Sequence, residues 1–116
     1  MLFRHLGQSG ISVSAIGLGC MGLSEFYGEP TQESEAISLL HRAVDLGITH
    51  FDTAEIYGRG RNEQLRGKSF AGRWDRIVLA TKFGPQRDPA TGDFVGLDGS
   101  PANVRKSCEK SLKRLG

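Results

Sequence analysis

The chain has 116 residues, of which 38% are hydrophobic and 24% are charged, which is the composition of an ordinary globular domain. This length favours all or part of a single domain. Fifteen Lys and Arg residues against thirteen Asp and Glu residues give a net charge of +2, too small to indicate a nucleic-acid or anionic-membrane partner.

Cysteine usage and hydropathy bear on the compartment. Cys20 and Cys108 form neither a C-x-x-C pair nor a zinc-binding spacing, and two cysteines are too few for a disulfide framework, so we expect free thiols and a reducing, cytoplasmic location. The N-terminal sequence MLFRHLGQSG lacks the apolar core of a signal peptide. No apolar run approaches the ~18 residues of a membrane span, so neither secretion nor membrane insertion is expected.

The first predicted elements are a β-hairpin and a strand–helix unit. Leu2–Leu6 and Ile11–Val13 flank a Gly-rich turn, which predicts a small hairpin. Residues 15–19 are predicted to form a short strand. A helix is predicted from Pro30-Thr31, because acidic residues suit its first turn and apolar residues then recur at helical spacing. Gly47 is predicted to end this helix, because glycine readily adopts the left-handed backbone conformation found just past a helix C-terminus.

Two further strand–helix units follow. Ile48–Asp52 and Ile77–Thr81 are apolar and predict strands, and Asn62-Glu63 are predicted to cap a short helix that ends near Phe70. Ser100-Pro101 predict the start of a third helix, with Ser as the cap and Pro in the first turn. The apolar stripe expected to be buried on this helix consists of Val104, Cys108, Leu112 and Leu115.

The order of these elements indicates the fold class. Strand and helix alternate three times at a spacing of about 30 residues, the size of one strand–helix unit. Near-continuous apolar strands separated by helices predict a parallel sheet covered by helices, so the class is α/β. The polar segment Gly84–Gly99 shows no periodicity and is predicted to be a surface loop.

Unusual residues follow the ends of all three strands: Gly17–Gly22 after the first, Asp52 at the second and Lys82 at the third. Parallel α/β proteins bind ligands at this edge of the sheet. A buried carboxylate needs a cation, so we expect Lys82 to pair with Asp52. Tyr57 lies on the loop after Asp52, and an ammonium beside a phenol lowers its pKa, so such a Tyr can protonate an oxyanion near neutral pH.

Each of these residues also has a structural interpretation. Asp52 can cap a loop, Tyr57 can be a packing aromatic, and Lys82 can be a strand-end lysine that reaches water. Their joint placement at one edge favours a functional site over a coincidence.

Four segments carry a family resemblance: GLGCMGLSEFYG, HFDTAEIYGRGRNEQL, IVLATKFG and SPANVRKSCEKSLKRLG. They resemble the N-terminal third of aldo-keto reductases, which are NADPH-dependent enzymes built on a (β/α)8 TIM barrel. The resemblance covers nearly the whole chain. It implies that residues 1–116 are an N-terminal fragment of a single barrel domain, consisting of a hairpin and about three strand–helix units.

The resemblance implies reduction of a small aldehyde or ketone to an alcohol, with hydride from NADPH and a proton from Tyr57. It implies that Lys82 lowers the pKa of Tyr57, and that Asp52 pairs with Lys82 beside the nicotinamide. The hairpin is expected to plug the bottom of the barrel.

Further contacts follow from the same resemblance. Gly19, Cys20 and Met21 are expected to touch the cofactor, and Tyr27 to line the substrate pocket. No metal ligands are expected.

The chain departs from the family pattern in two respects. The family has a catalytic histidine at the end of the fourth strand, which lies beyond Gly116, and His5, His41 and His50 do not match it. A barrel needs about 250 residues, so three units leave an open sheet edge. We therefore expect the chain alone to be inactive and to self-associate through that edge. Arg66 also stands where the family usually has an aliphatic residue, which casts doubt on the packing of the second helix.

Other interpretations are weaker. GLGCMG matches G-x-G-x-x-G, but a Rossmann dinucleotide site needs a helix that opens directly on the glycines, and Leu23–Pro30 intervene. His50 and Asp52 share a strand face, but two ligands do not make a metal hydrolase site. A regulatory, non-catalytic relative that binds the cofactor remains an alternative. The basic residues of the last helix are interpreted as its solvated outer face: Arg105, Lys106, Lys110, Lys113 and Arg114.

Overall fold

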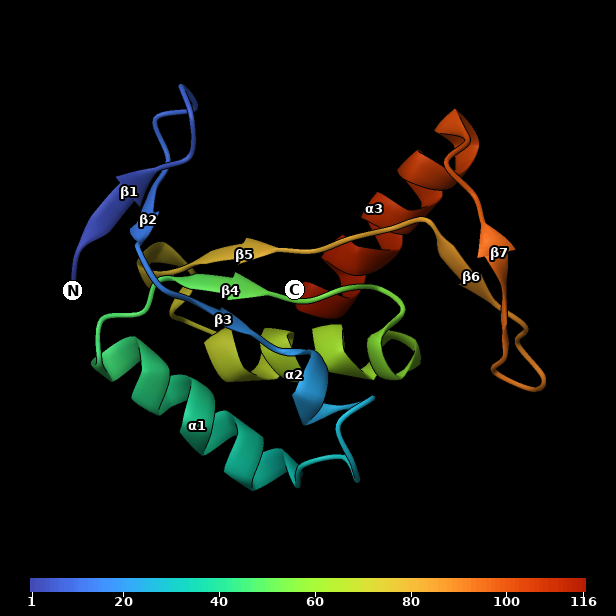
Figure 1. The fold of residues 1–116 in the computed structure, drawn as a ribbon, viewed down its shortest axis with the longest axis horizontal. Coiled ribbons are helices and arrows are strands. Elements are labelled where there is room, and N and C mark those ends of the chain that lie inside the picture. The colour runs from blue at the N-terminus through green and yellow to red at the C-terminus, as the bar shows by residue number, and fades with distance from the viewer.

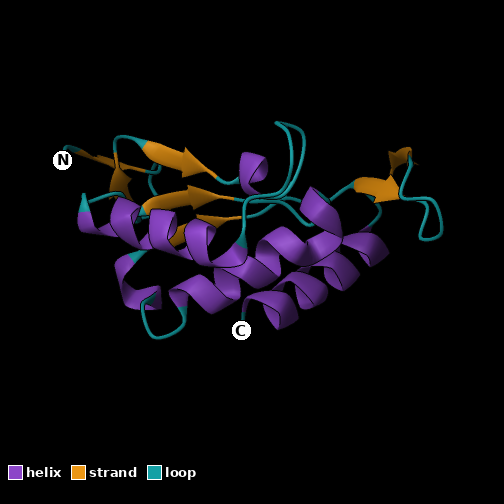
Figure 2. Ribbon diagram, turned by 90° about the horizontal axis from the view of Figure 1, so that it is seen from below, coloured by secondary structure: helices purple, strands orange, loops and turns teal.

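The computed structural model describes residues 1–116 as a three-stranded parallel sheet with helices against one face. Strands β3 (Gly17–Gly19), β4 (His50–Asp52) and β5 (Val78–Ala80) pair in the order β3-β4-β5 (Figure 1). Figure 2 shows the helices layered on one side of this sheet. The last residues of the strands are in register, since Gly19 pairs with Asp52 and Asp52 pairs with Ala80. The predicted α/β class and parallel sheet are therefore confirmed.

The predicted N-terminal hairpin is present as β1 (Phe3–His5) and β2 (Ser12–Ser14), which pair antiparallel. Its second strand is attached to the start of the sheet by two reciprocal hydrogen bonds. The Ser14 amide donates to Thr49 Oγ1 at 2.8 Å, and the Thr49 amide donates to Ser14 Oγ at 2.9 Å. The hairpin thus lies at the amino end of the strands, away from the edge where Asp52 lies.

Three helices follow the three strands. Helix α1 spans Glu33–Asp45, α2 spans Arg61–Phe70 and α3 spans Pro101–Leu115, while short 3-10 turns form η1 (Met21–Leu23), η2 (Tyr57–Gly60) and η3 (Trp74–Arg76). The predicted terminal signals are present. Gly47 has a φ of +90° just past α1, and Ser100 Oγ accepts a hydrogen bond from the Asn103 amide at the start of α3.

The core lies between the sheet, α1 and α2. Phe51 of β4, Leu40 of α1 and Phe70 of α2 are completely buried. The rings of Phe51 and Phe70 pack at a centroid separation of 4.8 Å. Four smaller core residues surround them, namely Cys20, Ala43, Val44 and Ile77. Burial of these side chains is what fixes the helices to the sheet.

The capping assignment for α2 was wrong. Gly60, with a φ of +86°, occupies the N-cap position, and no side chain caps this helix. Asn62 and Glu63 lie inside the first turn and are completely buried, because both point towards the sheet rather than back to the helix backbone. Their partners are described with the site below.

The segment Gly84–Gly99, predicted to be a surface loop without periodicity, contains regular secondary structure. The segment forms an antiparallel hairpin of β6 (Pro85–Arg87) and β7 (Phe94–Leu97). A register shift at Gln86/Arg87 interrupts the alternation of side chains between the two faces, which is the pattern by which strands are recognised in a sequence. The Asp88 carboxylate closes the turn by accepting hydrogen bonds from the amides of Ala90 and Thr91 at 2.8 and 2.9 Å.

The buried face of α3 differs from the predicted one. Val104, Cys108 and Leu112 are exposed, Leu112 by 65%, whereas the small polar residues Asn103 and Ser107 are buried. The reason is a close approach of α2 and α3 at Gly67, where a Cβ atom would lie 2.6 Å from the carbonyl oxygen of Arg114. Only small side chains fit such a contact, so the apolar stripe faces outwards without a partner.

Two further features of the chain concern the edges of the sheet and the apolarity of the helices. Both outer edges of the sheet, along β3 and β5, lack a neighbouring strand. None of the helices combines the length and apolarity that crossing a bilayer requires.

The core assignment is tested by Leu40→Ala. Leu40 is 0% exposed, and removal of a fully buried Leu side chain costs about 2–5 kcal/mol of unfolding free energy. The neighbouring Leu39, which is 43% exposed on the same helix, supplies a matched control whose Ala variant should lose less than about 0.5 kcal/mol. Urea unfolding followed by far-UV circular dichroism compares the two variants. Equal losses would contradict the packing described here.

The two thiols should differ in reactivity. Cys108 is exposed, whereas Cys20 is buried and its burial raises the pKa of the thiol, although Arg66 opposes this effect. We expect a disulfide-exchange reagent to modify one thiol rapidly in the folded, unreduced chain and the second only after unfolding. Rapid reaction of both thiols under native conditions would contradict the buried position of Cys20, and no thiols after unfolding would indicate a disulfide.

Candidate active site

Asp52, Lys82 and Tyr57 lie together at the carboxyl edge of the sheet. Asp52 ends β4, and Lys82 follows β5 by two residues, so the parallel register brings their side chains to the same edge. The Lys82 ammonium donates hydrogen bonds to Asp52 Oδ1, to the carbonyl oxygen of Thr53 at 2.8 Å and to the Tyr57 hydroxyl at 3.3 Å. Lys82 Nζ also lies 5.0 Å from the centre of the Tyr57 ring.

The hydrogen bonds keep Lys82 protonated. Partial burial alone lowers the pKa of the Lys82 ammonium, but the hydrogen bonds to Asp52 and Tyr57 outweigh burial, so the pKa lies above its usual value. Asp52 is less buried than its apolar neighbours suggest, because 41% of its side chain and 48% of the Lys82 side chain are exposed. An ion pair this open stabilises the fold only modestly.

The loop that carries Tyr57 is held by the segment before α1. The Gly58 amide donates a hydrogen bond to Glu25 Oε2 at 2.9 Å. The ring of Phe26 meets the Tyr57 ring edge to face, with a centroid separation of 6.4 Å and an interplanar angle of 79°. Phe26 adopts a φ of +74°, which is uncommon for a residue with a side chain. Tyr57 is thus positioned by this one segment in addition to Lys82.

Phe26 is the aromatic neighbour of Tyr57, and the role of the adjacent Tyr27 in lining a substrate pocket stays a prediction. Tyr27 is 78% exposed, and its ring lies beside Gly22, where a Cβ atom would lie 3.3 Å from Tyr27 Cδ2. No pattern in the sequence predicts which of Phe26 and Tyr27 contacts Tyr57, because the loop between η1 and α1 has no periodic structure.

The glycine-rich segment after β3 lies beside Asp52. The Cys20 amide donates a hydrogen bond to the carbonyl oxygen of Asp52 at 2.8 Å. Cys20 is completely buried, and its amide and carbonyl groups already bond to Asp52 and Asn62, so it offers a ligand neither its side chain nor a free backbone group. Gly19 is exposed and Met21 is half-buried. Of the three residues predicted to meet a cofactor, Gly19 and Met21 are therefore the accessible ones.

Asn62 connects the ends of β3 and β4. Its side-chain amide donates to the carbonyl oxygen of Cys20 and to Ser24 Oγ, both at 2.8 Å. Its Oδ1 atom accepts a hydrogen bond from Thr53 Oγ1 at 2.6 Å. Thr53 is the residue whose carbonyl oxygen binds Lys82. A buried amide that satisfies groups from both strand ends holds those ends at a defined separation.

Glu63 makes the equivalent connection to β5. Its Oε1 atom accepts a hydrogen bond from Thr81 Oγ1 at 2.7 Å, and its Oε2 atom pairs with Arg114 Nη1 of α3 at 2.6 Å. Thr81 directly precedes Lys82 in the chain. The requirement that a buried carboxylate find a cation could have suggested this partner, because Arg114 is one of the basic residues of the last helix.

Arg66 is buried in the same layer. Its side chain is completely buried, and Nη2 donates long hydrogen bonds to the carbonyl oxygen of Cys20 at 3.5 Å and to Asn62 Oδ1 at 3.4 Å. Nε and Nη1 have no partner, and burial lowers the pKa of the guanidinium. The doubt about helix packing is resolved, since α2 packs on the sheet with Arg66 inside the layer.

The competing interpretations do not match this geometry. Gly22 lies within the 3-10 turn η1, and an irregular segment separates it from α1, which begins at Glu33, so no α-helix opens on the glycines as a Rossmann site requires. His50 and Asp52 are not joined by a third potential ligand, because no group of three or more His, Cys, Asp or Glu side chains is arranged to hold a metal ion. His41, on α1, lies 2.8 Å from the carbonyl oxygen of Ser69 through its Nε2 atom.

Comparisons with known proteins agree on one family. The model of the aldo/keto reductase family matches residues 15–116. The chain is 45% identical over 115 residues to the aldo-keto reductase yakc [NADP(+)] of Schizosaccharomyces pombe, covering 97% of this chain and 33% of that protein.

Solved structures agree with the sequence comparison. The holo form of aldo-keto reductase AKR11C1 from Bacillus halodurans superposes with a TM-score of 0.88 at 37% identity, over 99% of this chain and 36% of that one. An aldo-keto reductase from Klebsiella pneumoniae in complex with NADPH superposes with a TM-score of 0.69 at 32% identity, over 90% of this chain and 32% of that one.

The chain spans about a third of the length of these relatives. Its hairpin and three strand–helix units correspond to the N-terminal portion of their (β/α)8 barrel, as the sequence predicted. Because the family model extends over residues 15–116, nearly the full length described, this chain belongs to the aldo/keto reductase family.

Proposed function

We propose that this chain carries the proton-donating part of an NADPH-dependent enzyme that reduces aldehydes or ketones to alcohols. The observation that supports it is the convergence of the Lys82 ammonium on Asp52 and on the Tyr57 hydroxyl, which lies 3.3 Å from Lys82 Nζ. A phenol, an ammonium and a carboxylate in contact at the ligand-binding edge of a parallel sheet form a proton-delivery unit.

Each residue has a distinct role in this proposal. Tyr57 donates its hydroxyl proton to the oxygen of the substrate carbonyl as negative charge develops there. Lys82 stabilises the phenolate that remains, because an ammonium next to an anion favours its charged form. Asp52 and the carbonyl oxygen of Thr53 fix the Lys82 ammonium in place through hydrogen bonds, so that it does not rotate away into water.

NADPH is the proposed cofactor, and it supplies the hydride to the carbonyl carbon. The Schizosaccharomyces pombe relative carries NADP(+) in its name, and the Klebsiella pneumoniae relative was solved with NADPH. Gly19 leaves room for a flat ring to lie against the end of β3, because the space into which a Cβ atom would point holds no other atom within 4 Å. We infer that Gly19, Met21 and Asp52 form this chain's part of the nicotinamide site, and that the buried Cys20, between Gly19 and Met21, holds them in place through its backbone hydrogen bonds to Asp52 and Asn62.

We also propose a small carbonyl compound as the substrate and a reducing cellular compartment. The edge of the sheet suits a small carbonyl compound, and Phe26 is better placed than Tyr27 to contact it beside Tyr57. Two free cysteines, one of them exposed, suit a reducing location such as the cytoplasm.

The role of Tyr57 is tested by Tyr57→Phe in a complete barrel that contains this segment. We expect carbonyl reduction to fall by about 10²- to 10⁴-fold, because only the proton donor is removed. Cofactor binding, followed by quenching of protein fluorescence on the same preparation, should change little, since the ring still packs against Phe26. A variant that keeps most of its turnover would assign the acid to another group.

The chain alone should show little or no reductase activity and bind NADPH weakly. Only about a third of a barrel is present, and the open β5 edge and the outward apolar stripe of α3 leave apolar surface uncovered. We therefore expect marginal stability or self-association. Size-exclusion chromatography and a fluorescence titration with NADPH test the two parts. A sharp monomer peak with micromolar cofactor binding, or a measurable turnover, would contradict this expectation.

A further inference from the structure

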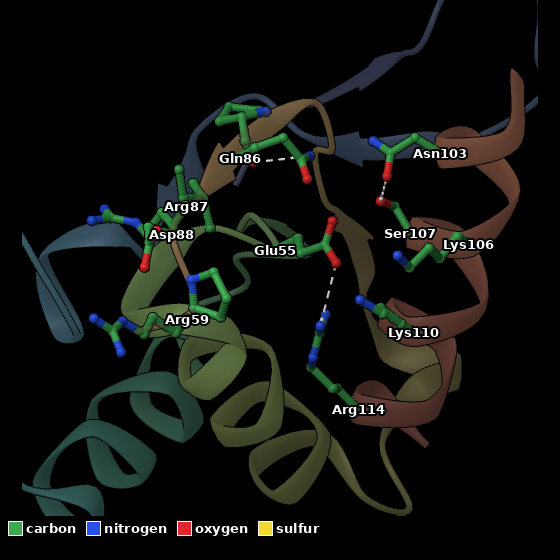
Figure 3. Close-up of a pocket in the computed structure, with 13 residues that line it drawn as sticks. Glu55, Arg59, Gln86, Arg87, Asp88, Asn103, Lys106, Ser107, Lys110 and Arg114 are labelled. Atoms are coloured by element: carbon green, nitrogen blue, oxygen red, sulfur yellow. Dashed lines mark hydrogen bonds and ion pairs between the residues drawn. The ribbon is translucent and has the colours of Figure 1, made fainter. Parts of the chain in front are cut away.

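A polar recess lies beside the candidate active site, between the Tyr57 loop, the β6–β7 hairpin and α3 (Figure 3). Its volume is about 230 Å³, and only one of the thirteen residues that line it is hydrophobic. The recess includes Glu55 and Ile56, which immediately precede Tyr57, but it shares none of Asp52, Tyr57 and Lys82. It is therefore adjacent to the candidate active site and distinct from it.

One face of α3 supplies the basic side of the recess. Lys106, Lys110 and Arg114 lie four residues apart along this helix, so their side chains share a face, with Ser107 next to them. Figure 3 shows the ends of Lys106 and Lys110 directed from α3 into the recess, towards Glu55. These lysines were predicted to belong to a solvated outer face, and both are exposed, but they also line the recess.

The acidic groups of the recess already have partners. Glu55 Oε1 lies 3.3 Å from Arg114 Nη2, so its charge is shared with that guanidinium. The Asp88 carboxylate accepts hydrogen bonds from the amides of Ala90 and Thr91. Neither carboxylate forms an ion pair with a lysine of the recess.

Three cations that line the recess form no ion pair, namely Arg59, Lys106 and Lys110. Arg87 pairs with Glu25 at 2.5 Å, whereas neither Lys106 nor Lys110 has a carboxylate oxygen within 4.0 Å. Ser107, which is 3% exposed, makes only a long hydrogen bond of 3.4 Å to Asn103 Oδ1. The recess thus presents two ammonium groups and a weakly engaged hydroxyl in a confined volume.

We propose that this recess binds the phosphate group of a small phosphorylated molecule. A phosphate monoester carries about −1.5 to −2 charges at neutral pH, which matches the two unpaired ammonium groups, and its oxygens accept hydrogen bonds from ammonium and hydroxyl donors alike. Lys106 and Lys110 bind the phosphate oxygens, and the Ser107 hydroxyl donates a third hydrogen bond when it turns from its long bond to Asn103 Oδ1. The ligand is recognised by its charge and not by the carbonyl chemistry of the neighbouring site.

Inorganic phosphate is the probe for the experiment. Amide chemical shifts of a complete barrel that contains this segment are followed by ¹H–¹⁵N NMR during a phosphate titration, with sodium chloride adjusted to hold the ionic strength constant. We expect saturable shifts centred on residues 103–110 and on Glu55 and Ile56. The absence of saturable shifts in the unmodified chain would overturn the proposal.

A pair of double variants separates this site from general attraction to a basic helix. Lys106→Gln with Lys110→Gln should weaken phosphate binding by about tenfold or more, because both ammonium donors to the phosphate oxygens are removed. Arg105→Gln with Lys113→Gln removes the same charge from exposed positions of α3 outside the recess, and binding should change by less than about twofold. Equal weakening by both pairs would overturn the proposal. The single variants Lys106→Gln and Lys110→Gln should each fall between the unmodified chain and the first pair.

Discussion

The buried carboxylate of Glu63 is the group on which the arrangement of α2, α3 and the sheet depends. It has no access to water and is held by Arg114 from α3 and by Thr81 at the end of β5. Loss of one partner of such a pair costs about 3–5 kcal/mol, because the other charge is then buried without compensation. Both the position of Lys82, which follows Thr81, and the course of α3 are therefore tied to a single side chain of α2.

Asn62 and Arg66 extend this constraint to the other two strand ends. Asn62 satisfies groups at Cys20 and Thr53, and Arg66 reaches the same carbonyl oxygen of Cys20. The layer between α2 and the sheet is thus polar directly beneath the candidate active site, whereas it is apolar around Phe51 and Phe70. Hydrogen bonds in a polar network restrict the distances and angles between its groups more strictly than apolar packing does. The arrangement also has an energetic cost, because two buried nitrogens of Arg66 lack a hydrogen-bond partner.

Local patterns were sufficient to predict most elements and the contact of Lys82 with Asp52. Gly47 and Ser100 mark helix ends through backbone chemistry that depends only on neighbouring residues. The strand-end contact was predictable because parallel strands must end at the same edge once their apolar residues are buried. Asn62 and Glu63 were misassigned because their partners lie far away in the sequence, Arg114 by 51 residues, and polar residues at a helix start look the same whether they cap it or reach outwards.

The misassigned face of α3 shows how this segment relates to a complete barrel. An amphipathic helix pattern indicates that an apolar stripe will be covered, but not by which neighbour. In this chain Asn103 and Ser107 face inwards, and the apolar stripe faces the same side as the open β5 edge, where Leu112 and Leu115 line a hollow with Trp74 and Leu79.

In a (β/α)8 barrel the next strand lies along β5 and the next helix packs beside α3, so one addition would cover both surfaces. The two faces of α3 thus have separate roles. On one face Arg114 pairs with Glu63 in the layer beneath Lys82, and the apolar face is left for the part of the barrel that the relatives possess beyond this length.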